Sequence, residues 1–293
     1  MKNKKSRFST ILLLILFFVG LSVMLYPTIS NWWNSRTQSK VVATYQQAVS
    51  RLNDGEEEQI LKRAVDYNKA LSKLYNPLLD YEQVPDYDDI LDISGTGVMG
   101  VINIPQIGVE LPIYHGTSEG VLNIAVGHLQ GSSLPVGGRG THAVISAHRG
   151  LPSAELFTNL DKLVVGDMFT VTVLRTVYSY EVDNIFIVLP HEVEELKIDP
   201  ERELLTLMTC TPYGINTHRL LVRAHRVGTE TIEDKLEIKV IPDAVVVDSL
   251  SVVPFIALPM VALLLAWWLF GGKKRKPPTL EDADSLTDND NRK

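Results

Sequence analysis

Residues 203–227 read ELLTLMTCTPYGINTHRLLVRAHRV, and this stretch decides the fold. Two runs rich in aliphatic and β-branched residues flank a turn-rich segment that contains Pro212, Gly214 and Asn216. The pattern predicts two strands joined by a loop. If the strands pair as a hairpin, Cys210 at the end of the first strand faces Arg219 at the start of the second.

Short runs of the same character recur from residue 98 onward, each bounded by Gly, Pro, Asn or Asp. They cover residues 98–104, 109–114, 141–147, 168–174 and 176–189, while residues 155–163 read as one short helix. Many short strands with few helices predict a mainly β fold, a closed or nearly closed barrel. Residues 35–74 instead space their apolar residues as a helix does, with a break near 53–55, and predict helices packing on the barrel.

Cys210 is the single cysteine of this 293-residue chain, which excludes an intramolecular disulfide and a Cys-rich zinc site. A lone cysteine is most often an inert buried residue. At a strand end, however, it is accessible, and a neighbouring arginine favours its thiolate. The Arg219 guanidinium can also stabilise the oxyanion that forms when a thiolate attacks a carbonyl. Spacing alone leaves both interpretations open.

A thiolate nucleophile needs a proton partner, usually a histidine. His148 is the best placed of seven, because it ends an apolar strand where a loop begins. His142 lies on the same face six residues earlier and is the main rival, and His218 alternates to the face opposite Arg219. The other four lack a nearby feature: His115, His128, His191 and His225. No motif predicts a metal site, and we expect neither a metal nor a cofactor.

Two uncharged segments frame this region. Residues 8–34 follow a basic N-terminus and predict a transmembrane signal-anchor over residues 8–30, with the N-terminus cytoplasmic. A cleaved signal peptide is the alternative, although no small-x-small cleavage site follows the apolar run. Residues 249–272 precede a Lys/Arg cluster and predict a second transmembrane helix, also with its positive end inside.

The segments give the chain a simple layout. The parts are a cytoplasmic basic N-terminus (1–7), the anchor (8–30), a helical region (31–75), a lid or linker (76–97), a catalytic barrel (98–230), a linker (231–248), the second transmembrane helix (249–272) and a cytoplasmic tail (273–293). The catalytic part then lies outside the cell membrane and both termini lie in the cytoplasm. The net charge of -7 argues against nucleic acid as a partner.

At these residues the sequence resembles the sortases, and within them the class C, pilin-polymerising branch of Gram-positive bacteria. The matching segments are ISAHRGLP (145–152), TCTPY (209–213), NTHRLLV (216–222), GVMG (97–100) and LPVGG (134–138), within about residues 85–228. The resemblance implies an eight-stranded sortase barrel with N-terminal helices and two flanking transmembrane helices. It also implies a catalytic Cys-His-Arg site, carried here onto Cys210, His148 and Arg219.

In sortases the thiolate attacks the Thr-Gly bond of an LPXTG-like sorting signal, and an amine resolves the acyl-enzyme. In class C that amine is a pilin lysine, so the resemblance implies pilin subunits with a sorting signal and an acceptor lysine as partners, together with the membrane. Three alternatives stay open at this point. They are a housekeeping sortase that acts on a peptidoglycan precursor, a thiol protease or hydrolase, and a non-catalytic membrane-tethered β domain.

Class C enzymes usually cover the site with an Asp-Pro-aromatic lid before the first strand. Residues 76–97 contain no Asp-Pro pair. The nearest pieces are Asp80-Tyr81 and Asp86-Tyr87, which make these four residues the lid candidates. We therefore expect a shortened or atypical lid.

Overall fold

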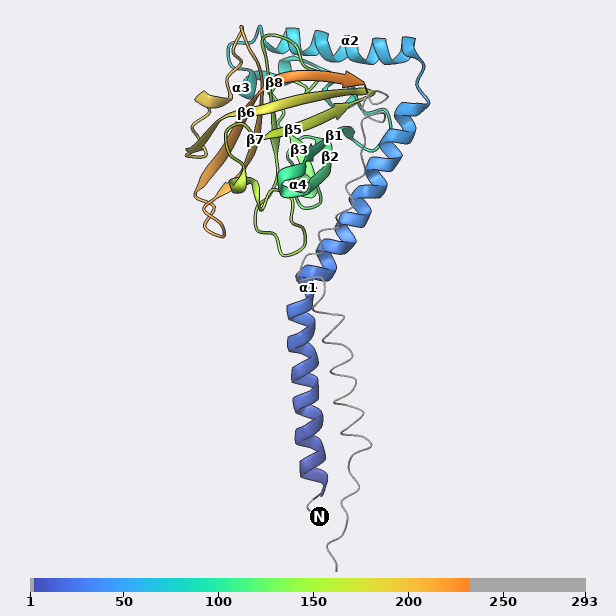
Figure 1. Ribbon diagram of the computed structural model, residues 1–293, viewed down its shortest axis with the longest axis vertical. Helices are drawn as coiled ribbons and strands as arrows, with labels where there is room; N and C mark the ends of the chain where they lie inside the picture. The colour runs from blue at the N-terminus through green and yellow to red at the C-terminus, as the bar shows by residue number, and fades with distance from the viewer. Residues whose placement is uncertain (1–2, 232–293) are drawn as a thin grey trace, which may run out of the picture. The chain divides into compact units, whose positions relative to one another are not determined.

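The computed structural model describes residues 3–231, with helices at the start and strands from residue 98 onward (Figure 1). The α-helices are α1 (Asn3–Ser50), α2 (Asp54–Leu71), α3 (Pro77–Asp80) and α4 (Glu119–Leu122). The 3-10 turns are η1 (Tyr81–Gln83), η2 (Tyr87–Asp89), η3 (Pro105–Ile107), η4 (Leu160–Lys162) and η5 (Glu194–Leu196). The strands are β1 (Val98–Ile104), β2 (Val109–His115), β3 (Val126–His128), β4 (Thr141–Ser146), β5 (Met168–Val173), β6 (Thr176–Val188), β7 (Glu203–Thr211) and β8 (His218–Thr231). The predicted second transmembrane helix at 249–272, with its linker and tail, lies outside the described residues.

The strands close into a barrel in the order β1-β2-β3-β4-β7-β8-β6-β5, which confirms the predicted eight-stranded fold. The β2/β3 and β4/β7 pairs are parallel and the other pairs are antiparallel. Alternate side chains of each strand fill the interior, among them Ile102, Ile113 and Leu207. The sequence missed β3, because three residues are too few to show an alternating pattern.

The predicted helix over residues 155–163 was wrong. The structure has turns there and one short 3-10 segment, η4. Leu156 has a positive φ of 39°, a conformation that an α-helix cannot contain. Phe157 and Leu160 are fully buried from this irregular loop, so the apolar spacing that suggested a helix reflects loop side chains filling the barrel end.

α1 runs without a break through Pro27. Within the described chain it is the one helix long and apolar enough to cross a membrane, and those properties suit an anchor and a signal sequence equally. Its C-terminal part packs on the barrel, where the Tyr45 hydroxyl donates to the Met99 carbonyl (3.1 Å) and accepts from the Leu174 N–H (2.8 Å). Burial raises the pKa of Tyr45 well above its ordinary value, so this bridge stays neutral.

The middle of α1 also touches the barrel, at the loop that follows β4. The Asn34 side-chain amide donates to the Ser153 carbonyl at 2.7 Å. The Glu155 N–H donates to the Asn31 side-chain oxygen at 3.0 Å. One helix therefore holds both β1 and the loop after residue 148.

α2 begins at the predicted break near 53–55, and the structure shows a capping box there. Asn53 accepts from the Glu56 N–H (2.9 Å), and the Glu56 carboxylate accepts from the Asn53 N–H (3.0 Å). The Arg175 guanidinium, in the β5–β6 turn, donates to Asp54 and Glu57 of this helix, each at 3.1 Å. Together with buried Tyr67, these contacts place the predicted helical region against the barrel (Figure 1).

Candidate active site

The outer faces of β4, β7 and β8 carry the residues singled out by the sequence. Met208 of β7 lies opposite Ser146 of β4 on one side and Leu221 of β8 on the other. Two residues after Met208, on the same face of β7, Cys210 lies opposite Arg219. The predicted pairing across the hairpin mouth is confirmed.

His148 reaches the same row through the parallel pairing of β4 with β7. The ladder continues past Ser146, because the Ala147 N–H donates to the Met208 carbonyl at 3.1 Å. The Thr209 hydroxyl then donates to the Ala147 carbonyl at 2.8 Å. Two residues beyond Ser146 and Met208 come His148 and Cys210, so the order across the face is His148, Cys210, Arg219.

The three side chains of this row are free to meet a substrate. Across residues 3–231, neither the Cys210 thiol nor the His148 imidazole has a hydrogen-bond partner, and the thiol is partly buried. Within the same described residues, the Arg219 guanidinium donates only to backbone carbonyls, those of Asn216 (3.3 Å) and His218 (3.1 Å). A cation without a carboxylate beside a free thiol suits the stabilisation of an oxyanion.

His142, the main rival for the proton-transfer role, is already engaged. Its Nδ1–H donates to the Lys197 carbonyl and its Nε2 accepts from the Thr206 hydroxyl, both at 2.8 Å. Burial lowers the pKa of His142 despite the carbonyl partner. A buried ring with both nitrogens occupied cannot exchange a proton with Cys210.

The remaining histidines are held elsewhere or lack a role at the thiol. His128 is fully buried against Ser133 and Tyr87, and burial lowers its pKa to about 4. His115 contacts the carbonyls of Gly97 and Ile90. His218 begins β8 opposite Thr211, one position off the face of Arg219. His191 is exposed in the β6–β7 connection, and His225 lies midway along β8, 3.9 Å from Asp183.

The lid candidates occupy different environments. Tyr87 is buried, where its hydroxyl donates to the His128 Nδ1 (2.9 Å) and accepts from the Gly116 N–H (2.9 Å). Asp86 is exposed with a positive φ of 69°. Asp80 and Tyr81 are partly buried at the junction of α3 and η1. The described contacts of these four residues include none with Cys210, His148 or Arg219.

A different residue of this segment reaches the outer face of the barrel. Leu78 of α3 packs against a cluster formed by Val144, Leu196 and Leu221, together with Met208. Met208 and Leu221 form the row immediately below Cys210 and Arg219. The segment before β1 therefore covers apolar surface next to the candidate site through a leucine.

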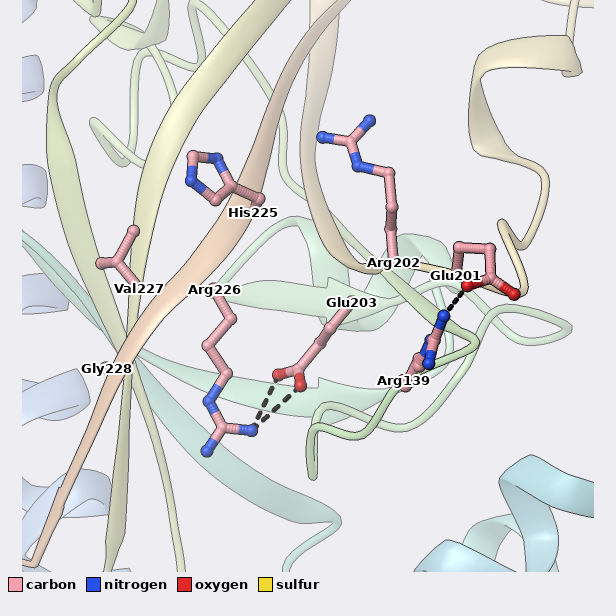
Figure 2. A pocket seen from close by; sticks show the side chains of 8 residues that line it. All are labelled: Arg139, Glu201, Arg202, Glu203, His225, Arg226, Val227 and Gly228. Carbon is pink, nitrogen blue, oxygen red and sulfur yellow. Dashed lines mark hydrogen bonds and ion pairs between the residues drawn. The ribbon is translucent and has the colours of Figure 1, made fainter.

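An open hollow of about 570 Å³ lies at the opposite ends of β7 and β8 (Figure 2). Its charges are paired: Arg226 donates to both carboxylate oxygens of Glu203 at 2.9 and 3.1 Å, and Arg139 pairs with Glu201. Six residues of β7 lie between Glu203 and Cys210, so this hollow is not the candidate active site. Among residues 3–231, no cluster of His, Cys, Asp or Glu is placed to hold a metal ion.

Sequence reasoning missed Arg149, which follows His148 directly. Its side chain is 8% exposed and pairs with Asp161. The one available signal was its position beside a candidate catalytic residue, and arginines next to loops are usually solvated.

Comparison with known proteins agrees with this geometry. The family model for the sortase domain matches residues 102–227. "Sortase A" of Streptococcus agalactiae serotype III (strain NEM316) is 27% identical over 223 residues, which cover 73% of this chain and 82% of that protein.

Two solved structures are more similar in sequence. Sortase C1 from Streptococcus agalactiae is 46% identical with a TM-score of 0.59, over 64% of this chain and 98% of that chain. Sortase C of Streptococcus pneumoniae, whose structure was described for catalysis and pilin substrate specificity, is 42% identical with a TM-score of 0.59, over 66% of this chain and all of that one. On this similarity, and with the barrel and the Cys210–Arg219 pairing in place, the chain belongs to the sortase family, in its class C branch.

Proposed function

We propose that this chain is a pilin-polymerising transpeptidase in which Cys210, His148 and Arg219 carry the reaction. The observation that supports it most is the row of His148, Cys210 and Arg219 at one end of the β4–β7–β8 face, where no described side chain pairs with any of the three. The likeness to sortase C enzymes adds the substrate class, a pilin with an LPXTG-like sorting signal and an acceptor lysine.

The first half-reaction forms a thioester. The Cys210 thiolate attacks the threonine carbonyl carbon, the carbon–nitrogen bond to glycine breaks, and protonated His148 gives its proton to the leaving amine. Arg219 donates to the carbonyl oxygen while it carries negative charge. Its remaining N–H groups can do so because no carboxylate competes for them in the described structure.

The second half-reaction transfers the acyl group. The pilin lysine amine attacks the thioester carbon, His148 accepts the proton that this amine loses, and the carbon–sulfur bond breaks. The products are an isopeptide bond and regenerated Cys210. Water in place of the lysine gives a hydrolase, and an amine of the peptidoglycan precursor gives a housekeeping sortase.

The reaction takes place outside the cell membrane, with α1 as an uncleaved anchor and its N-terminus in the cytoplasm. Trp32 and Trp33 are exposed side by side after the apolar part of the helix, and Arg36 lies 4.9 Å from the Trp32 ring centre. Aromatic and basic side chains at this point are typical of the bilayer interface. The second transmembrane helix, residues 249–272, remains a prediction.

The test incubates the full chain with candidate pilins and analyses the products by mass spectrometry. We expect crosslinks between a pilin lysine and the threonine of the cleaved signal. A free threonine carboxylate would identify a hydrolase, and a threonine joined to a peptidoglycan amine would identify a housekeeping sortase. If the sorting signals of all candidate pilins stayed intact after incubation with the full chain, the proposal would be contradicted altogether.

We propose in addition that the cover over this site is atypical and depends on Leu78. The Leu78→Ser change should remove its apolar contact with the Val144–Leu196–Leu221 cluster and accelerate alkylation of Cys210. Leu79→Ser is the matched control, because Leu79 is 76% exposed. Equal alkylation rates in the two variants would show that Leu78 covers nothing the reagent needs.

A further inference from the structure

Arg149 is a buried cation beside the catalytic row. Its side chain is 8% exposed. Nη2 donates to the Asp161 carboxylate at 2.5 Å, and Nη1 donates to the Thr211 hydroxyl at 3.3 Å. Its Nε–H is buried without an acceptor among the described residues. Burying a guanidinium this far costs folding free energy even when it is paired. We therefore expect Arg149 to contribute to function rather than to stability.

The two segments that Arg149 joins are those that carry the thiol and the imidazole. Arg149 follows His148 in the chain, and Thr211 follows Cys210. The same guanidinium lies 5.9 Å from the ring centre of Tyr213 in the β7–β8 loop. Because the guanidinium is planar with fixed donor directions, these contacts hold the end of β4 against the end of β7 and the loop that follows it.

The close approach of the two loops depends on Gly150. Its φ is +77°, and a Cβ built there would lie 2.9 Å from the Tyr213 ring. Any larger residue would be strained at this φ and would displace the Tyr213 ring from its place over Gly150. The backbone thus places Arg149 where it can reach Thr211 and Tyr213 at once.

Asp161, the carboxylate partner of Arg149, is half-exposed but belongs to a segment whose neighbouring side chains are packed. It lies in η4, next to buried Leu160. The Phe157 N–H donates to the His148 carbonyl at 3.2 Å, and the Phe157 side chain is fully buried. The ion pair of Arg149 with Asp161 therefore connects the residue next to His148 to the packed end of the barrel.

We propose that Arg149 is a positioning residue for the transpeptidation, one that holds the His148 imidazole at proton-transfer distance from Cys210. The inference rests on the proposed function of the row. Arg149 itself touches neither the thiol nor the imidazole in any described contact. Because Asp161 neutralises its charge, it acts by geometry, and misplacement of a reacting group by about 1 Å can cost about 10²-fold in rate.

The experiment uses the full chain in detergent, with a fluorogenic LPXTG-type peptide as substrate and iodoacetamide as an independent probe of Cys210. The variants are Arg149→Met, Arg149→Lys and Asp161→Asn. Arg175→Met is the matched control, since Arg175 is also a partly buried arginine bound to carboxylates, but at the α2 contact. Thermal unfolding is recorded for each variant.

We expect Arg149→Met to lower kcat by about 10²-fold while KM changes little, and Arg149→Lys and Asp161→Asn to fall between it and the parent. We also expect Arg149→Met to change the pH profile of Cys210 alkylation, which a loss of stability alone would leave unmoved. Arg175→Met should lower the unfolding temperature without either effect.

Two outcomes would overturn the positioning role. One is a kcat within about twofold of the parent in Arg149→Met together with an unchanged alkylation profile. The other is an equal loss of kcat in Arg175→Met at the same loss of stability. If the parent cleaves no peptide while Arg149→Met still alters alkylation of Cys210, the proposed function fails, and what stands is that Arg149 controls the surroundings of Cys210.

Discussion

The two ends of the β4–β7–β8 face carry the same kinds of side chain in opposite states. At one end, His142 has both ring nitrogens bonded and Asp183 binds both Arg202 and Arg223, while on the inner side of the same end Arg226 is bound by Glu203. At the other end, the row of His148, Cys210 and Arg219 has no such partners among residues 3–231. At the first end the protein itself supplies the hydrogen-bond and charge partners of these side chains. At the second end those positions are left for an incoming substrate.

Residue type alone therefore does not tell a structural residue from a catalytic one in this part of the barrel. An arginine paired with a carboxylate, such as Arg223 with Asp183, contributes to the fold and offers little to a ligand. Arg219, which donates only to carbonyls, keeps N–H groups for a developing oxyanion. Substituting one residue at each end and comparing the two variants tests this distinction directly.

Removal of the thiol should have the largest effect. We expect Cys210→Ala to abolish acyl-enzyme formation and lower kcat/KM by at least ~10⁴-fold, because no other described side chain of the row is a nucleophile. The acyl-enzyme is measured by mass spectrometry after quenching. Leu204→Val at the far end of β7 should lower stability by about 1 kcal/mol and leave the acylation rate per folded molecule unchanged.

A comparison of the two histidines on β4 comes next. We expect His148→Ala to lower kcat by about 10³-fold, since both half-reactions lose their proton carrier. His142→Ala should keep kcat but lower the free energy of unfolding by about 2 kcal/mol, because it leaves the Lys197 carbonyl and the Thr206 hydroxyl unpaired. Single-turnover cleavage and urea titration measure the two effects. If the two variants lost activity equally, the contrast between the ends would fail.

The two arginines should differ in the same way. Arg219→Lys keeps the charge but loses the planar fork, and we expect kcat to fall by about 10²-fold with little change in stability. Arg226→Lys should disturb the two-oxygen contact with Glu203 and affect only stability. Steady-state kinetics with a sorting peptide, beside thermal unfolding, separate the outcomes. A kcat for Arg219→Lys equal to that of the parent would remove Arg219 from the mechanism.

The smallest expected effect is on the pH dependence of stability. Burial lowers the pKa of His128 from about 6.5 to about 4, so between these values the unfolded chain binds the proton more readily. The free energy of unfolding therefore contains a share that comes from His128 being neutral in the folded chain. This share is complete above pH 6.5 and is lost as the pH falls toward 4. It amounts to about 2 kcal/mol between pH 7 and pH 5. Urea unfolding at the two pH values measures it, and His128→Gln should have a smaller pH slope; an equal slope would contradict the assignment.

Local patterns predicted most of the strands and the Cys210–Arg219 pairing, because a hairpin brings neighbours in sequence together. The position of His148 beside Cys210 depends on the parallel β4/β7 pairing across a long separation in sequence, which periodicity cannot supply. The contact of Arg149 with Asp161 was beyond reach for a related reason. It depends on a loop turned by the positive φ of Leu156, where the sequence suggested a helix.

The contact of Tyr45 with β1 and the β5–β6 turn decides where the chain can be cut. A soluble fragment that begins after Ser50 would lose the buried side chains of Val42 and Tyr45, and it would leave the Met99 carbonyl and the Leu174 N–H without partners. A fragment that begins near residue 35 would keep the barrel intact but lose the hydrogen bonds of Asn31 and Asn34 to the loop after His148. The shortest soluble fragment with a complete core therefore starts upstream of Val42, and its turnover relative to the full chain measures what the anchor helix adds to catalysis.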